Sequence, residues 1–291
     1  LSTQQIQSLF DFAQQMEASY EKTKNFLGRA QLAPPKVVAN LFFEPSTRTR
    51  LSFEMATTRL GLSCLSMDSM SSTSLTKGES FADTILNVAA MQPDLIVIRY
   101  GDSRELDELL PTLNIPVISA GTGVLAHPTQ ALLDAYTILK ERKKIAGERV
   151  LIVGDIRHSR VARSNVDVLT RMGAEIGICG PPLFMPESHL FPHVKRFNRI
   201  EDGIAWATVL MGLRIQLERH DSKEIHSEKV VKTFTEYEIN LSRLSKFIDD
   251  GIVMHPGPIN HGVEFAPGVL QDQRSRVLSQ VTNGVFIRAS L

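Results

Sequence analysis

The chain has 291 residues, with 32 Lys or Arg balanced by 32 Asp or Glu, so its formal net charge is zero. This length is about twice that of a typical domain and predicts two domains, or one large α/β unit, whose core needs no disulfides. The charge balance excludes a protein that binds nucleic acid or anionic lipid by bulk attraction, and two isolated cysteines exclude a Cys-based zinc site.

The order of predicted elements along the chain indicates an α/β fold. Apolar residues at three- and four-residue steps predict a helix over 2–27, and Gly28 ends it. Short apolar runs that do not alternate with polar residues then predict strands buried on both faces at 37–43, 95–98, 116–119, 150–153, 175–179, 208–211 and 252–254. Helices are predicted at 47–60, 79–90, 128–144 and 159–172, with a last one over 277–289. We therefore expect two domains, each a mainly parallel sheet flanked by helices.

The boundary between the two expected domains lies near 140–147, where a charged run ends a helix and Gly147 precedes a new strand. The stretch 217–246 is charged and weakly periodic, and we expect it to be a moving loop with short helices. No run reaches the roughly 18 to 20 apolar residues of a membrane span, and residues 1–30 do not resemble a signal sequence. We therefore expect a soluble, cytoplasmic protein.

The turn after the first predicted strand has the composition of an anion site. Ser46 is a good N-cap for the helix that follows, and the first turn carries Arg48, Arg50 and several hydroxyl groups. Backbone N–H groups at the positive end of a helix dipole, together with arginines, suit a phosphate. The alternative is an ordinary capped helix with exposed arginines. There is no Walker lysine and no G-x-G-x-x-G sequence here, which argues against a nucleotide.

Three motifs in this order resemble one enzyme family. The Ser-Thr-Arg-Thr-Arg sequence at 46–50 resembles the carbamoyl phosphate motif of the aspartate and ornithine carbamoyltransferases. The sequence at 127–134 resembles the second motif of that family, and 254–258 resembles the third motif of its aspartate branch. The ornithine branch is expected to have His-Cys-Leu-Pro there, and this chain has no cysteine after Cys179. The resemblance covers essentially the whole chain.

The resemblance implies an activity, a domain assignment and a set of site residues. The activity is transfer of the carbamoyl group of carbamoyl phosphate to the α-amine of L-aspartate, an early step of pyrimidine biosynthesis, without a metal or other cofactor. The implied domains are a carbamoyl phosphate-binding domain over 1–143, completed by a C-terminal helix at 275–291 that packs back on it, and an aspartate-binding domain over 144–274. The implied catalytic residues are Arg48, Thr49, Lys77, Arg99 and His127. The residues implied to hold carbamoyl phosphate are Ser46, Thr47, Arg48, Thr49, Ser74, Arg99, His127, Gln130, Pro256, Gly257 and Pro258. Those implied to hold aspartate are Lys77, Arg160, Arg214 and Gln216.

The resemblance also implies an assembly. The polar segment at 71–79 reads by itself as an exposed flexible loop. In the family, the positions of Ser74 and Lys77 enter the active site of the neighbouring subunit, which implies a homotrimer with shared sites. A regulatory chain or a dihydroorotase partner, as found with some relatives, is left open by the sequence, as is a catalytically silent scaffold.

Two local features complete the expectations. His261 stands where many members of the family have an arginine, so we expect a weaker or pH-sensitive basic contact there. The resemblance also makes the Gly257-Pro258 bond a candidate for the cis form. The glycine turn at 154–160 lacks the second and third glycines of a dinucleotide-binding motif, which makes that alternative a weak one.

Overall fold

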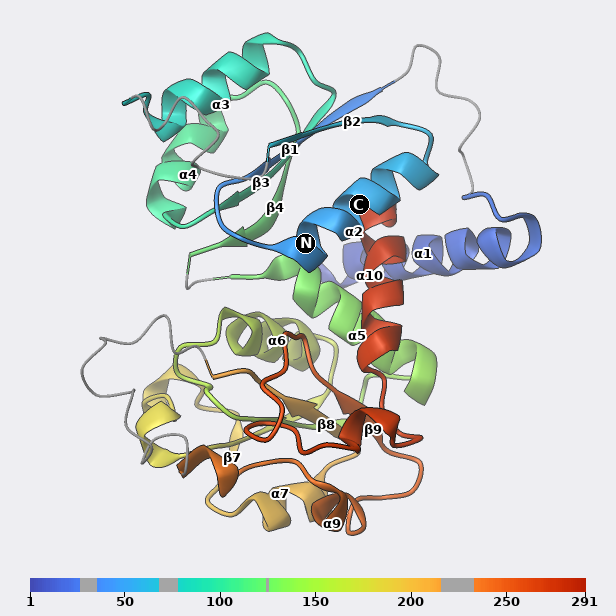
Figure 1. Ribbon diagram of the computed structural model, residues 1–291, viewed down its shortest axis with the longest axis vertical. Coiled ribbons are helices and arrows are strands. Elements are labelled where there is room, and N and C mark those ends of the chain that lie inside the picture. Colours follow the sequence, from blue (N-terminus) through green and yellow to red (C-terminus); the bar gives the residue numbers. More distant parts are fainter. Residues whose placement is uncertain (27–35, 68–77, 124–125, 216–232) are drawn as a thin grey trace. The chain divides into compact units, whose positions relative to one another are not determined.

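The computed structural model describes residues 1–26, 36–67, 78–123, 126–215 and 233–291. The chain forms two compact units, which are described one at a time (Figure 1). Unit 1 contains residues 1–129 and 281–291, and unit 2 contains residues 130–280. Within the described ranges, no helix has the length and apolar character needed to cross a membrane.

Unit 1 is built on a four-stranded parallel sheet in the order β2-β1-β3-β4. The strands are β1 (Val37–Phe42), β2 (Ser63–Met67), β3 (Leu95–Tyr100) and β4 (Val117–Thr122). Three of them coincide with predicted runs. Strand β2 was not predicted, because it is an edge strand whose residues are exposed or only half-buried and therefore carry no apolar run.

Helices cover both faces of this sheet, as the continuous apolar runs predicted (Figure 1). On one face, Leu41 packs in a cluster with Ile85 of α3 (Phe81–Ala90) and Leu106 of α4 (Ser103–Leu109). On the other face, Phe42 packs with Phe53 of α2 (Thr47–Arg59). Successive residues of a strand point to opposite faces, so each of these positions must be apolar.

The C-terminal helix packs back on unit 1. The first helix, α1 (Thr3–Thr23), begins with a capping box between Ser2 and Gln5. In the last helix, α10 (Val277–Ser290), the ring of Phe286 stacks on that of Phe26 at 5.3 Å between centroids. Two residues further on, Arg288 Nη1 donates a hydrogen bond of 2.8 Å to Ser52 Oγ in α2. The expectation that a last helix returns to the N-terminal domain is confirmed.

Unit 2 contains a five-stranded parallel sheet in the order β7-β6-β5-β8-β9. Its strands are β5 (Arg149–Val153), β6 (Glu175–Cys179), β7 (Lys195–Phe197), β8 (Val209–Gly212) and β9 (Ile252–Met254). Its helices include α6 (Arg160–Arg171), α7 (Ile200–Trp206) and α9 (Leu241–Leu244), and α5 (Pro128–Arg142) begins at the division between the units. Strand β7 was not predicted, because it is a three-residue edge strand that begins with Lys195-Arg196.

Each sheet has a point at which the strand order reverses. In unit 1 the chain passes from β1 to β2 on one side and later adds β3 on the other side of β1. In unit 2 it passes from β5 to β6 and later adds β8 on the other side of β5. Open α/β sheets bind ligands at the carboxyl ends of the strands beside such a reversal. The fold therefore points to the residues that follow β1, β3, β5 and β8.

Candidate active site

The first group of candidate residues lies at the start of α2, directly after β1. Ser46 occupies the N-cap position, as predicted, but its side chain makes no capping hydrogen bond within the described structure. Arg50 N donates to Ser46 O at 3.1 Å, which closes the first turn. Thr49 is buried, whereas Thr47 and Arg48 are exposed. Backbone N–H groups in the first turn of a helix have no acceptor within that helix. Together with the Ser46 hydroxyl, they are placed to donate to an anion.

Arg99 lies at the carboxyl end of β3, opposite Phe42 at the end of β1. Only 8% of this residue is exposed, so its charge needs partners. Its Nε lies 3.3 Å from Glu44 Oε2, and its Nη1 lies 3.5 Å from Ala120 O and 3.5 Å from His127 Nε2. The carboxylate of Glu44 therefore compensates the charge and orients the guanidinium. Glu44 was missed by the sequence reasoning, although it stands between the strand and the Ser-Thr-Arg-Thr-Arg motif.

His127 directly precedes α5 and is also buried. An arginine can only donate, so this contact favours the tautomer in which Nε2 accepts from Arg99 and Nδ1 carries the proton. Gly121 packs against both side chains. A Cβ at this position would lie 3.5 Å from Arg99 Nη1 and 3.7 Å from His127 Cγ, and its φ of +123° is one that only glycine adopts readily.

The second group lies in unit 2, after β5 and β8. Arg160 is the first residue of α6 and is 5% exposed, while Ser159 Oγ caps this helix by accepting from Ala162 N at 3.1 Å. Arg214 follows β8 by two residues and is half-buried. The chain segments that carry the two arginines approach closely, because a Cβ on Gly154 would lie only 2.7 Å from Leu213 O. The two arginines therefore start from adjacent strand ends.

The third motif follows β9, which pairs with β8. His255 is buried, and its Nδ1 accepts a hydrogen bond of 2.8 Å from Gly257 N. The Gly257-Pro258 bond is cis, which confirms the expectation from the family resemblance. The motif at 255–258 therefore stands at the same edge of the sheet as the chain segment that carries Arg214.

A buried carboxylate joins the chain segments that follow β8 and β9. Glu264 Oε1 accepts from Ile215 N at 2.9 Å, and its Oε2 accepts from Asn260 N at 2.8 Å. Burial raises the pKa of the Glu264 carboxyl, although these hydrogen bonds oppose the rise. Sequence reasoning gave Glu264 no role. The carboxylate ties the residue next to Arg214 to the turn that carries His261, which is itself exposed.

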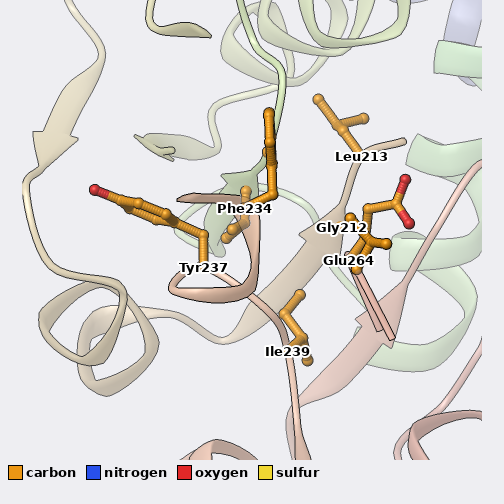
Figure 2. A pocket seen from close by; sticks show the side chains of 9 residues that line it. Gly212, Leu213, Phe234, Tyr237, Ile239 and Glu264 are labelled. Atoms are coloured by element: carbon orange, nitrogen blue, oxygen red, sulfur yellow. The ribbon is translucent and has the colours of Figure 1, made fainter. Parts of the chain in front are cut away.

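A small, mainly apolar pocket, part of which is open to solvent, lies beside Glu264. Figure 2 shows Leu213 and Glu264 on one side of it and Phe234 and Tyr237 on the other. No sequence motif pointed to this pocket. Three candidate residues from the sequence, Ser74, Lys77 and Gln216, lie outside the described residues, as does most of the stretch 217–246.

Comparisons with protein families match both halves of the chain. Residues 1–140 match the model described as "Aspartate/ornithine carbamoyltransferase, carbamoyl-P binding domain". Residues 146–291 match the model described as "Aspartate/ornithine carbamoyltransferase, Asp/Orn binding domain". Together these two models span almost the whole chain.

Similar proteins and structures point to the same family. A protein of Solibacter usitatus named aspartate carbamoyltransferase catalytic subunit is 43% identical over 286 residues, which cover 95% of this chain and 93% of that protein. A protein of the same name from Sorangium cellulosum is 41% identical over 100% of this chain and 89% of its own length. Among solved structures, aspartate transcarbamoylase of Trypanosoma cruzi in complex with N-(phosphonacetyl)-L-aspartic acid has a TM-score of 0.88 at 28% identity, covering 100% of this chain and 91% of that one. Ornithine carbamoyltransferase of Pyrococcus furiosus has a TM-score of 0.87 at 25% identity, covering 99% and 92%. The fold is thus common to both kinds of enzyme.

Proposed function

Since the chain belongs to the aspartate/ornithine carbamoyltransferase family, we propose that it transfers the carbamoyl group of carbamoyl phosphate to the α-amine of L-aspartate. The products are N-carbamoyl-L-aspartate and phosphate, and the reaction is an early step of pyrimidine biosynthesis in the cytoplasm. The observation that carries the proposal is the position of the cationic residues, which follow the strands beside the reversal point of each sheet. We assign the carbamoyl phosphate domain to 1–143 with 275–291 and the aspartate domain to 144–274.

The start of α2 is proposed to bind the phosphate of carbamoyl phosphate. The donors would be first-turn backbone N–H groups of residues 47–49, the guanidinium of Arg48, and the hydroxyl groups of Thr47 and Thr49. The hydroxyl of Ser46 makes no capping bond that would compete with the phosphate. Arg99, His127 and Gln130 would hold the carbamoyl end, with backbone groups of the 256–258 segment. In the tautomer favoured by the Arg99 contact, the Nδ1–H group of His127 would serve as one donor to the carbonyl oxygen.

Arg160 and Arg214 are proposed to bind the two carboxylates of aspartate. A guanidinium can meet a carboxylate with two parallel hydrogen bonds, and a dicarboxylic acid needs two such groups. Their start from adjacent strand ends supports this assignment, because it brings two positive charges to one edge of the sheet. Lys77 and Gln216 complete the proposed aspartate set on the family resemblance.

The chemistry proposed is direct attack of the aspartate amine on the carbamoyl carbon. A free α-amine has a pKa of about 8, so the bound amine must lose a proton, and the leaving phosphate is a suitable acceptor. Thr49, Arg99 and His127 would donate to the carbonyl oxygen as its negative charge grows. Loss of one such donor typically lowers the rate by about 10²–10³-fold. Arg48 and Lys77 would stabilise the charge on the departing phosphate.

A rate assay decides between this function and its alternatives. Phosphate release from carbamoyl phosphate is measured with L-aspartate and, separately, with L-ornithine. We expect turnover with aspartate alone. Turnover with ornithine alone would assign the chain to the other branch of the family, and no turnover with either would indicate a scaffold without activity.

The active site is proposed to be shared within a homotrimer, with Ser74 and Lys77 supplied by the neighbouring subunit. Mixing Arg48→Ala and Lys77→Ala chains under subunit exchange then creates some sites with neither substitution. We expect activity above the sum of the two parents. Activity equal to that sum would mean that each site is built from one chain.

A further inference from the structure

Asp134 in α5 is a fully buried carboxylate for which sequence reasoning found no role. Three side-chain amides converge on it. Gln130 Nε2 and Gln280 Nε2 lie 2.9 and 2.8 Å from its Oδ1, and Asn165 Nδ2 lies 2.8 Å from its Oδ2. The first of these amides belongs to a proposed carbamoyl phosphate residue, one helical turn before Asp134.

Two of these amide orientations are fixed independently by backbone groups. Gln280 Oε1 accepts a hydrogen bond of 2.9 Å from His255 N, which can only donate, so its nitrogen must face Asp134. Asn165 Nδ2 also donates to Val161 O at 3.1 Å, and a carbonyl can only accept. Both oxygens of Asp134 therefore act as acceptors.

The same logic fixes the amide of Gln130. Its contact with Asp134 is made to the oxygen that already accepts from Gln280, so the atom facing that oxygen must be the donor Nε2. The Oε1 atom, on the other side of the amide carbon, is then directed away from Asp134. Gln130 consequently directs its acceptor oxygen, rather than its NH2 group, away from Asp134.

We propose that Asp134 is a positioning residue that makes Gln130 selective for the NH2 group of carbamoyl phosphate. The inference rests on the proposed function, in which Gln130 contacts the carbamoyl group. An amide oxygen held in this orientation accepts from the NH2 group, whereas the methyl group of an acetyl compound offers no donor and leaves the oxygen unsatisfied. Asp134 thus acts on specificity without touching the substrate.

The test compares two unreactive ligands that differ only in this group. Phosphonoacetamide carries NH2, and (2-oxopropyl)phosphonate carries CH3 in its place. Their dissociation constants are measured by calorimetry with the full chain. Asp134→Ala opens a polar space that water can fill, and water both donates and accepts, so the Gln130 amide is no longer fixed.

We expect Asp134→Ala to reduce the preference for phosphonoacetamide by about tenfold, the value of one hydrogen bond of about 1.4 kcal/mol. Gln130→Ala removes the amide oxygen altogether, so its loss of preference for phosphonoacetamide is the upper limit for the effect of Asp134→Ala. The matched control is Asn165→Ala, which truncates the other member of the Asp134–Asn165 pair but leaves the Gln130 contact in place. It should retain the preference of the wild type. Equal weakening of both ligands by Asp134→Ala, or the same loss of preference in the control, would overturn the inference.

A measurement on the wild type keeps the inference testable if Asp134→Ala does not fold. Neutron diffraction of crystals with phosphonoacetamide distinguishes nitrogen from oxygen in the Gln130 amide. Oxygen facing the ligand NH2 supports the inference, and nitrogen facing it refutes the inference. Neither measurement requires turnover, so failure of this inference is distinct from failure of the proposed function, which the aspartate assay reports.

Discussion

Replacing Glu44 by Gln tests whether the ion pair with Arg99 prepares that arginine for the reaction. The two charges lie 3.3 Å apart, which corresponds to an attraction of about 5 kcal/mol at an effective dielectric constant of about 20. Desolvation offsets most of this, and an ion pair close to the surface contributes up to about 1 kcal/mol net. Because only 9% of the Arg99 side chain is exposed, we take the upper value, about 1 kcal/mol, although 28% of the Glu44 side chain is exposed.

This free energy corresponds to about a fivefold change in rate. We therefore expect kcat/KM for carbamoyl phosphate to fall about fivefold in Glu44→Gln, with little change in the KM for aspartate. Initial rates at saturating concentrations of the other substrate measure both constants. The shape of the side chain is retained, so the change reports on the charge.

Glu54→Gln is the matched control for this experiment. Glu54 pairs with Arg50 at 3.7 Å, and 26% of its side chain is exposed, but Arg50 is not among the proposed ligand residues. We expect wild-type kinetics within about twofold, since an exposed helical pair contributes only ~0.3–0.5 kcal/mol. If Glu44→Gln loses no more activity than Glu54→Gln, the argument that Glu44 orients Arg99 is refuted.

Three further predictions concern other parts of the chain. Arg214→Ala should greatly weaken aspartate binding and transfer while leaving carbamoyl phosphate binding mostly intact; an equal loss for both ligands in calorimetry would indicate a structural role. Gly121→Ala, at a φ of +123° beside Arg99 and His127, should lower both the melting temperature and kcat, whereas Gly147→Ala, at a φ of +77° with nothing within 4 Å, should lower only the melting temperature. Hydrogen bonds from Arg274 lower the pKa of the Asp272 carboxyl, so this pair stabilises the fold above the unfolded pKa near ~3.9 and loses that effect as the pH falls through the folded value. Asp272→Asn should therefore cost about 1 kcal/mol at pH 7 in urea unfolding, and the difference from wild type should shrink below about pH 4; a constant difference would contradict the linkage.

The sequence predicted the strands that carry buried apolar runs and missed the two that do not. A strand of a parallel sheet that is covered on both faces is mainly apolar and stands out as a run, as in β1, β3, β5 and β8, and the edge strands β4 and β9 carry such runs too. The two missed strands, β2 and β7, are edge strands that contain exposed residues. Backbone hydrogen bonds to β1 and β6 hold these two strands in their sheets. Backbone pairing does not require apolar side chains, so it leaves no pattern in the sequence.

The candidate cationic site residues could also be found from the sequence, because they lie in short motifs that follow predicted strands. Arg99 and Arg214 stand within two residues of a strand's carboxyl end, and Arg48 and Arg160 stand in the first turn of the helix that follows a strand. Parallel strands bring their carboxyl ends to one edge of a sheet. The order of the strands was not contained in the motifs. Only the folded sheets place these residues beside a reversal point.

The sequence by itself determined the α/β class, the family and the identity of the candidate cations, since these depend on local periodicity and short motifs. The tertiary structure decided which buried groups support them. Asp134 and Gln280 are 146 residues apart, and Ile215 and Glu264 are 49 apart, so no local pattern relates them. A buried carboxylate is tolerated only where donors from distant segments converge on it, and that convergence arises from the packing of the whole chain.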